Sequence, residues 1–404
     1  TSSVCKNSLL ILFRVIGGLF PTVTYLLLPY LTSIDISAGI VGVLSVAFIV
    51  STLLRFGVDQ YILKAGVNQT IGSTLINTAF TQLIVLTLVV FTLAFFFIQL
   101  FQFLIAPRLM FDDVVLQTVI LALPISILSI GFAFFASQSM KMTSIISFNI
   151  LPYALILLGV TIFESKVLII FLAFSIPCLY LLRFMRFNAV KSFSHTLLAN
   201  VETADLSKIY VVSLLAVLLT NMPVVYAMHI AIDELIYSTG VFVRLIGLSS
   251  FISTICYTLF ARELRAMTAG FAKQFKYLFV GYFFLGIGFS LLGVLTALIS
   301  QYYGIFGDSS STYQITSGEI FIYVIVLLPL ITIGNIIGYL LLVSGHISYL
   351  ILGLLVSNGL LVLSYSNQTL VSDFGITMLY FYALVLDSII KIGFYLLNLA
   401  KESV

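Results

Sequence analysis

Long apolar segments recur from one end of this sequence to the other. The first runs from about Ser8 to Leu31 and the second from about Ser37 to Val58. Each is long enough to cross a hydrocarbon core of about 30 Å as a helix. The chain is 61% hydrophobic and 8% charged, whereas soluble proteins carry about 25% charged residues. The sequence therefore predicts an all-α polytopic membrane protein and excludes a β-barrel, whose strands alternate polar and apolar residues.

By the same length criterion the chain holds about twelve spans. Their approximate positions are 8–31, 37–58, 72–105, 114–138, 142–163, 166–187, 208–231, 235–260, 275–300, 319–344, 346–366 and 375–399. The third is long for a single helix and must tilt or project from the membrane. The first lacks a small-residue cleavage site, so we interpret it as a retained span.

Basic and acidic residues alternate from loop to loop. One set of loops holds nearly all of the Lys and Arg, such as Lys64, Lys141 and Arg186, while the other is mainly acidic, with residues such as Asp112 and Glu164. Lys and Arg concentrate in cytoplasmic loops. The alternation therefore predicts an even number of spans, with both termini in the cytoplasm.

A polar segment at mid-chain divides the spans into two sets. We predict an N-terminal six-helix lobe at 1–190, a cytoplasmic linker at 191–207 and a C-terminal six-helix lobe at 208–404. Because each lobe has an even number of spans, the two have the same orientation, as parallel repeats do. Phe20-Pro21-Thr22-Val23 also resembles Met222-Pro223-Val224-Val225, at an offset of 202 residues. Such internal similarity is typical of duplication.

Four charged residues stand out inside predicted spans, namely Arg14, Arg244, Asp387 and Lys391. Each costs at least about 2.5–3.5 kcal/mol at a helix centre. Three of the four are basic, so we interpret them as lining a polar cavity between the lobes that binds an anionic group. The alternative for Arg14 and Arg244 is structural: they bond to backbone carbonyls freed by nearby Gly or Pro, or snorkel to an interface.

Asp387 and Lys391 are four residues apart, share one helix face and can pair. One interpretation is a self-neutralised pair that binds no ligand. The other is a switch, in which protonation of Asp387 frees Lys391 for substrate, or the reverse. On the second interpretation Asp387 is the candidate coupling residue.

Other polar positions have weaker signals. Asn221, close before Pro223, is the candidate cavity amide. Arg55 and Asp59 close the second span and are the candidate gate at its cytoplasmic end, although snorkelling alone also explains Arg55. The segment 334–338 fits the GxxxG pattern, which predicts a close-packed helix face.

Motifs for enzymes and metals are missing from the sequence. It has no P-loop, hence no intrinsic ATPase, and no HExxH. The three histidines are far apart and the three cysteines form no CxxC pair, so neither a metal site nor a disulfide framework is indicated. The net charge of +3 gives no sign of a nucleic-acid partner. We therefore expect a protein that is not an enzyme and has no resident cofactor or metal.

The opening of the chain resembles a known family. A Lys6-Asn7-Ser8 start precedes a first span with an early Arg and the pair Gly17-Gly18. A short acidic loop and a Gly-rich second span follow, ending in Leu53-Leu54-Arg55-Phe56-Gly57-Val58-Asp59-Gln60-Tyr61-Ile62-Leu63-Lys64. This resembles the opening of Wzx-type polysaccharide and O-antigen flippases, in the MOP exporter superfamily that includes MATE transporters and the peptidoglycan-precursor flippase. The two extra helices of that last branch are lacking here.

The resemblance implies a MATE-like, V-shaped bundle with a central cationic cavity. It implies a substrate of undecaprenyl diphosphate bearing an oligosaccharide repeat unit, flipped from the cytoplasmic to the periplasmic leaflet by alternating access. Arg14, Arg244 and Lys391 would then meet the diphosphate, with H+ or Na+ as the candidate coupling ion. The implied location is the bacterial cytoplasmic membrane, in lipopolysaccharide biosynthesis, with membrane lipids, a polysaccharide polymerase and a chain-length regulator as candidate partners.

Two other functions stay open at this point. A MATE-like exporter of organic cations needs carboxylates within its spans, and Asp387 is the one that qualifies. A membrane polysaccharide polymerase or ligase has a similar composition but needs a long periplasmic loop with catalytic bases. The predicted external loops here are short and acidic, with Arg108 and Lys166 as their bases.

Overall fold

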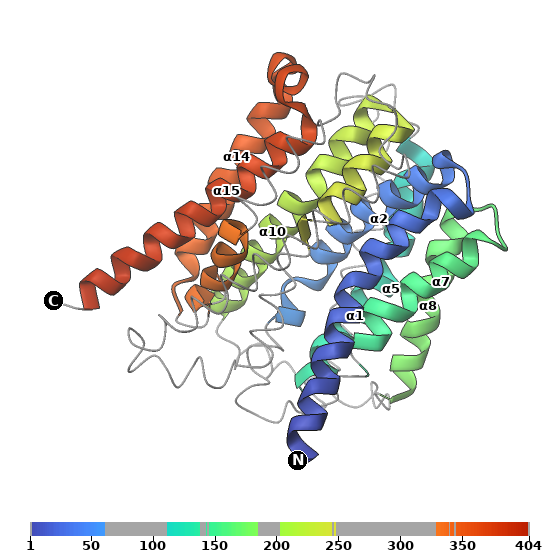
Figure 1. Ribbon diagram of the computed structural model, residues 1–404, viewed down its shortest axis with the longest axis horizontal. Helices are drawn as coiled ribbons and strands as arrows, with labels where there is room; N and C mark the ends of the chain where they lie inside the picture. The colour runs from blue at the N-terminus through green and yellow to red at the C-terminus, as the bar shows by residue number, and fades with distance from the viewer. Residues whose placement is uncertain are drawn as a thin grey trace. The chain divides into compact units, whose positions relative to one another are not determined.

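The computed structural model describes residues 2–60, 111–137, 143, 145–184, 203–244, 246–247, 329–338, 340–342 and 345–402 (Figure 1). The predicted spans at 72–105 and 275–300, most of the linker at 191–207 and the second half of the span at 235–260 lie outside the described residues. The chain divides into two compact units, Thr1–Val217 with Met228–Asp233, and Leu218–Ala227 with Glu234–Val404.

The first unit consists of six described helices together with the start of α10. They are α1 (Ser2–Leu31), α2 (Ile34–Arg55), α5 (Phe111–Ser137), the π-helix η1 (Ile146–Ile150), α7 (Leu151–Val160) and α8 (Lys166–Phe184). Helix α2 contacts α5 and α8, while α1 contacts α7 and η1. The first turns of α10 (Thr203–Ile230) also belong to this unit, and its middle belongs to the second.

Local sequence explains where α2 begins and ends. Ser33 is its N-cap, and the Ser33 hydroxyl accepts a hydrogen bond from the backbone N–H of Ile36 at 3.4 Å. Asp35 places a negative charge in the first turn, where the helix dipole favours it. At the other end Phe56 and Gly57 both adopt the left-handed conformation, with φ of 49° and 73°. Two such residues in succession stop the helix.

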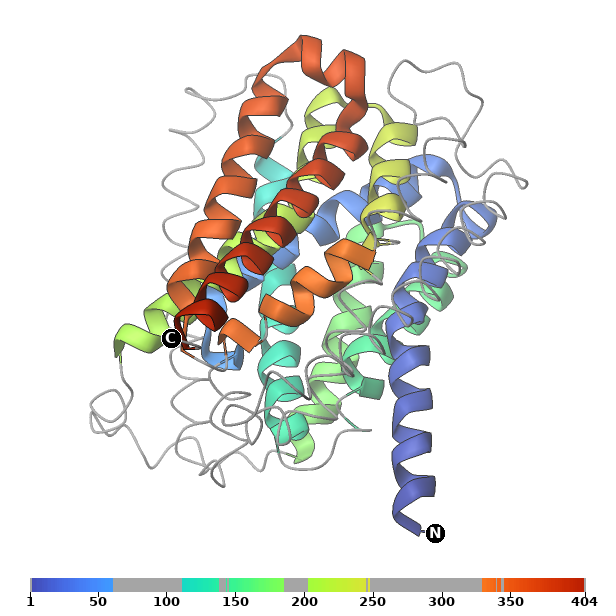
Figure 2. The same ribbon diagram turned by 60° about the vertical axis from the view of Figure 1, so that its left-hand side comes forward.

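The second unit contains the two longest apolar helices near the C-terminus. Helix α14 (Ile347–Ser366) and helix α15 (Gln368–Glu402) lie side by side (Figure 2). The Tyr365 hydroxyl donates a hydrogen bond to the carbonyl of Ile376 at 3.2 Å, at the end where the two helices are joined. Gly375, with φ 74° and ψ 157°, bends the chain inside α15. Helical residues at 234–244, 246–247, 329–338 and 340–342 complete the described part of this unit.

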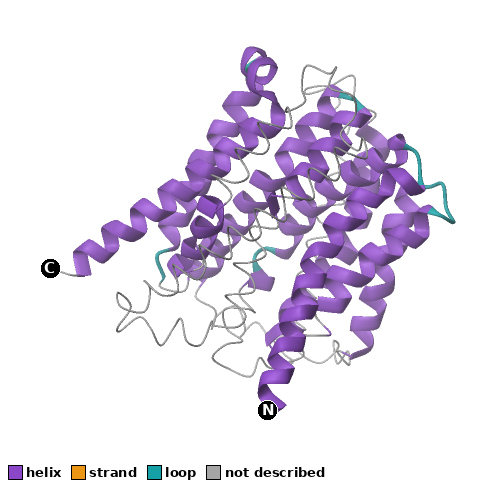
Figure 3. Ribbon diagram, viewed as in Figure 1, coloured by secondary structure: helices purple, strands orange, loops and turns teal. Residues whose placement is uncertain are grey.

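Four described helices are long and apolar enough to cross a membrane: Ile34–Arg55, Ser207–Ile230, Ile347–Ser366 and Gly375–Leu397. All regular structure in the described residues is helical (Figure 3). These findings confirm an all-α, multi-pass membrane protein. The total of twelve spans, the two six-helix lobes and the cytoplasmic position of the termini stay predictions.

Candidate functional site

The in-span residues Asp387 and Lys391 form an ion pair on α15. Lys391 Nζ contacts Asp387 Oδ2, as the four-residue spacing predicts. The two residues are 3% and 7% exposed. Both lie within the membrane-spanning segment Gly375–Leu397. The pairing predicted from the sequence is therefore present, and it is almost fully enclosed by protein.

Glycines on two neighbouring segments close around this pair. A β-carbon at position 338 would lie 3.6 Å from Cδ and Cε of Lys391, and one at 353 would lie 3.1 Å from Oδ1 of Asp387. Gly334, one turn before Gly338, approaches the backbone of Ser388 even more closely. The GxxxG pattern thus forms the close-packed face that the sequence predicts, and that face is the one against which the ion pair is buried.

The second oxygen of Asp387 has a different environment from the first. Within the described parts of the chain, Oδ1 is buried and no hydrogen-bond donor reaches it. Neither 329–342 nor α14 contains an Asp, Glu, Lys, Arg or His residue. The counter-charge that this cluster offers Asp387 is therefore the ammonium of Lys391.

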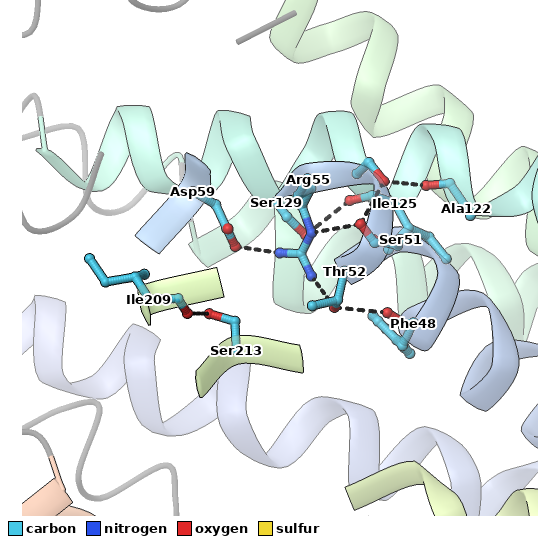
Figure 4. Close-up of polar contacts among 11 residues, drawn as sticks. Phe48, Ser51, Thr52, Arg55, Asp59, Ala122, Ile125, Ser129, Ile209 and Ser213 are labelled. Carbon is cyan, nitrogen blue, oxygen red and sulfur yellow. Dashed lines mark hydrogen bonds and ion pairs between the residues drawn. The ribbon is translucent and has the colours of Figure 1, made fainter. Parts of the chain in front are cut away.

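A second buried ion pair ends α2, in the first unit (Figure 4). Arg55 Nη1 contacts Asp59 Oδ2, Arg55 Nη2 donates to the Thr52 hydroxyl at 2.7 Å, and Arg55 Nε donates to the carbonyl of Ser51 at 3.2 Å. The same carbonyl accepts a hydrogen bond from Ser126 of α5 at 3.2 Å. The Arg55 side chain is 11% exposed. Snorkelling therefore does not account for Arg55, because internal acceptors hold its guanidinium.

The turn after Arg55 docks onto the first part of α10. The Phe56 ring stacks on Tyr210, with ring centroids 4.4 Å apart. Gly57 lies against the backbone of Tyr210, where a β-carbon would come within 3.0 Å of Cα and N. Its positive φ and this close approach both require glycine. The Arg55–Asp59 pair thus stabilises a turn that holds two helices of one unit together.

The remaining predicted site residues are separate from these pairs. Arg14 lies in α1, and its side chain is outside the description. Arg244 is half-buried and interacts electrostatically with the buried Tyr380 of α15. Asn221 is 8% exposed, and its amide donates to the Thr220 hydroxyl at 3.2 Å. Asn221 and Arg244 belong to the same unit as the Asp387–Lys391 pair.

Sequence reasoning missed two features. One is the polar network that anchors Arg55, and the other is the π-helix η1. Thr52 and Arg55 are three residues apart, which is a readable signal for a shared helix face, whereas Asp59 lies beyond the turn at Phe56 and Gly57. The sequence signal for the π-helix is weaker. Pro152, just after η1, has no N–H to donate and disturbs the bonding of the preceding turn.

Comparison with known proteins gives the fold. No protein-family model matches this sequence, and no curated protein matches it. Solved structures do match. A MATE transporter in the straight conformation superposes with a TM-score of 0.63 at 12% identity, over 99% of this chain and 95% of the other. The chain has the MATE fold.

Two further structures extend this likeness. The lipid II flippase MurJ in an inward closed conformation gives a TM-score of 0.59 at 14% identity, over 98% of this chain and 87% of the other. The MATE multidrug transporter DinF-BH, in a ligand complex, gives 0.56 at 16% identity, over 96% of this chain and 94% of the other. At these identities the likeness shows the fold alone. The MATE-like fold implied by the resemblance is thereby confirmed, while the V shape and the central cationic cavity stay predictions.

Proposed function

We propose that this protein is a flippase for undecaprenyl-diphosphate-linked oligosaccharide, such as an O-antigen repeat unit. It would move this lipid from the cytoplasmic to the periplasmic leaflet of the bacterial cytoplasmic membrane by alternating access. One observation carries the proposal: a fold shared over nearly its whole length with a lipid II flippase accompanies an excess of basic residues inside the predicted spans. Basic side chains in a protein interior suit an anionic substrate.

The basic residues inside the predicted spans suit the physical requirements of flipping such a lipid. A diphosphate with a sugar chain cannot cross hydrocarbon unaided, because its polar groups would lose their hydrogen bonds. Arg14, Arg244 and Lys391 would stabilise the diphosphate, and Asn221 would supply an amide to it. Asp387 would couple transport to H+ or Na+, while Arg55 and Asp59 would act at the cytoplasmic entrance. A polymerase and a chain-length regulator would act on the product.

A second candidate is a MATE-like exporter of organic cations, which the fold also allows. The state of the buried carboxylates argues against it. Asp387 is paired with Lys391 and Asp59 with Arg55. An organic cation bound at either carboxylate would have to displace the basic side chain already paired with it.

The test is rescue of cells that lack this protein. We expect lipid-linked oligosaccharide to accumulate on the cytoplasmic leaflet and wild-type protein to clear it. Arg244→Ala should reach the membrane at normal levels but clear little. Lys208→Ala, which removes an exposed cation, is the matched control and should clear the lipid as wild type does. Single repeat units in the periplasm with polymer missing would instead indicate a polymerase or ligase.

A further inference from the structure

The Asp387 carboxylate is an asymmetric group. One oxygen, Oδ2, is paired with the Lys391 ammonium, whereas Oδ1 is buried without a donor from the described residues. Buried carboxylate oxygens are normally satisfied, and each exception calls for a physical reason. Three things can satisfy such an oxygen: a donor brought by a conformational change, a cation or a proton.

The surroundings of the pair limit the choice. Gly353 faces Oδ1 and Gly338 faces the Lys391 stem, so no side chain from these positions can supply a donor. Tyr349 stacks on Phe394, and the Tyr365 hydroxyl bonds to a backbone carbonyl. The nearest charge is the lysine already in place, which repels a metal cation from Oδ1. Besides the pair itself, the titratable groups of α14 and of residues 376–399 in α15 are tyrosines, namely Tyr349, Tyr365, Tyr380, Tyr382 and Tyr395.

A proton at Oδ1 would change the charge of the site. The pair as it stands is neutral. When a proton from solvent binds Oδ1, the carboxyl group becomes neutral, its bond with the Lys391 ammonium weakens, and the site carries one positive charge. A buried, uncompensated charge is costly, and an anion near Nζ removes that cost. Each ligand therefore makes the other bind more tightly.

We propose that Asp387 and Lys391 form one site at which the binding of a proton and of a phosphate-type anion are positively linked. This proposal rests on the proposed function, because the anion is the class of group that the substrate carries. The sign is specific. Positive linkage means that the proton and the anion bind together, whereas direct competition for one site would make each exclude the other.

The experiment counts protons taken up when an anion binds. The full-length protein in lipid nanodiscs is titrated calorimetrically with undecaprenyl diphosphate, in buffers of differing ionisation enthalpy. The same titration with inorganic pyrophosphate shows whether the diphosphate alone suffices. The phosphate groups of each probe themselves gain or lose protons when the probe binds. All variants are therefore compared at one pH, where this contribution is the same. Asp387→Asn tests the site, and Glu164→Gln, an exposed carboxylate, is the matched control.

Wild type and Glu164→Gln should take up the same number of protons per anion bound. Asp387→Asn should take up fewer, by as much as one proton, while still binding. Equal uptake by Asp387→Asn and wild type would overturn the linkage and leave the flippase proposal standing. If wild type binds neither probe, both proposals fail together.

A second measurement uses wild type alone, which removes any concern about folding of the variants. Inorganic sulfate is a tetrahedral dianion whose charge does not change around neutral pH. Its affinity should rise roughly fivefold or more between a mildly alkaline and a mildly acidic buffer, the usual size of such couplings. A sulfate affinity that does not rise on acidification would overturn the proposal.

Discussion

Removing Lys391 tests how the C-terminal unit tolerates a charge within a span. In Lys391→Met the side chain keeps its length and loses its ammonium, so Asp387 stays buried at 3% exposure without its partner. Breaking a buried ion pair by removing one member costs about 3–5 kcal/mol, because the remaining charge is left uncompensated. Asp387→Leu, which keeps the branched shape, should cost a similar amount by leaving the ammonium alone.

The double variant should behave differently from either single one. Replacing both members of a buried pair by apolar groups of similar shape is often neutral or stabilising by about 1–4 kcal/mol. The coupling energy between the two positions should therefore exceed about 3 kcal/mol, the upper end of the range for residues in contact. The double variant should therefore regain the stability of wild type, but on the proposed function it should not regain transport.

The assay is unfolding of purified protein in mixed micelles with increasing dodecyl sulfate. The chain has no tryptophan, so far-ultraviolet circular dichroism reports the loss of helix. Asp59→Leu provides a comparison, because Arg55 keeps its bonds to Thr52 and Ser51. It should lose only about 1.5–3 kcal/mol, the worth of a hydrogen bond to a charged group. A Lys391→Met variant within about 1 kcal/mol of wild type would refute the reasoning.

Three further predictions use the same unfolding assay. Gly334→Ala should cost about 1–3 kcal/mol because its new methyl group meets the backbone of Ser388, whereas Gly338→Ala, with ordinary contacts, should stay within about 0.5 kcal/mol; equal losses would contradict this. Gly57→Ala should cost about 1–2 kcal/mol for its left-handed φ, and an unchanged midpoint would argue against that turn. Arg55→Lys should lose at least about 1.5 kcal/mol, because a single ammonium cannot reproduce the guanidinium fork; full stability would show that the fork is dispensable.

The helices that the sequence predicts best are those with uniform apolar runs and clear ends. The span predicted at 346–366 corresponds to α14, Ile347–Ser366, because Gly345 and Asn367 flank a mainly apolar stretch that has no charged residue. Helix α10 begins at Thr203, before the predicted 208. Hydropathy indicates where a helix enters the lipid. It does not detect helical turns made of polar residues outside the lipid, such as the first turn of α10.

In the candidate site, contacts within one helix could be predicted from the sequence, whereas contacts between helices could not. The Asp387–Lys391 pair could be predicted, since both residues lie on one helix at a fixed spacing. The glycines that enclose the pair come from segments 34 to 53 residues earlier. The sequence could not predict that these glycines pack against α15, because a GxxxG pattern indicates a close helix contact but not which helix makes it. The partners of Arg55 were missed for a related reason: its place near a helix end suggested solvent, while the left-handed turn at Phe56 and Gly57 folds Asp59 back onto it.

The measurement that addresses the central proposal most directly is transport by the purified protein. Proteoliposomes would contain this chain and a labelled undecaprenyl-diphosphate oligosaccharide, with a lectin added outside to report which leaflet holds the sugar. We predict protein-dependent movement of the labelled lipid between leaflets, reduced in Arg244→Ala. If the sugar lipid stays in its original leaflet while a fluorescent organic cation such as ethidium is transported, the flippase account is contradicted and the protein is a cation exporter.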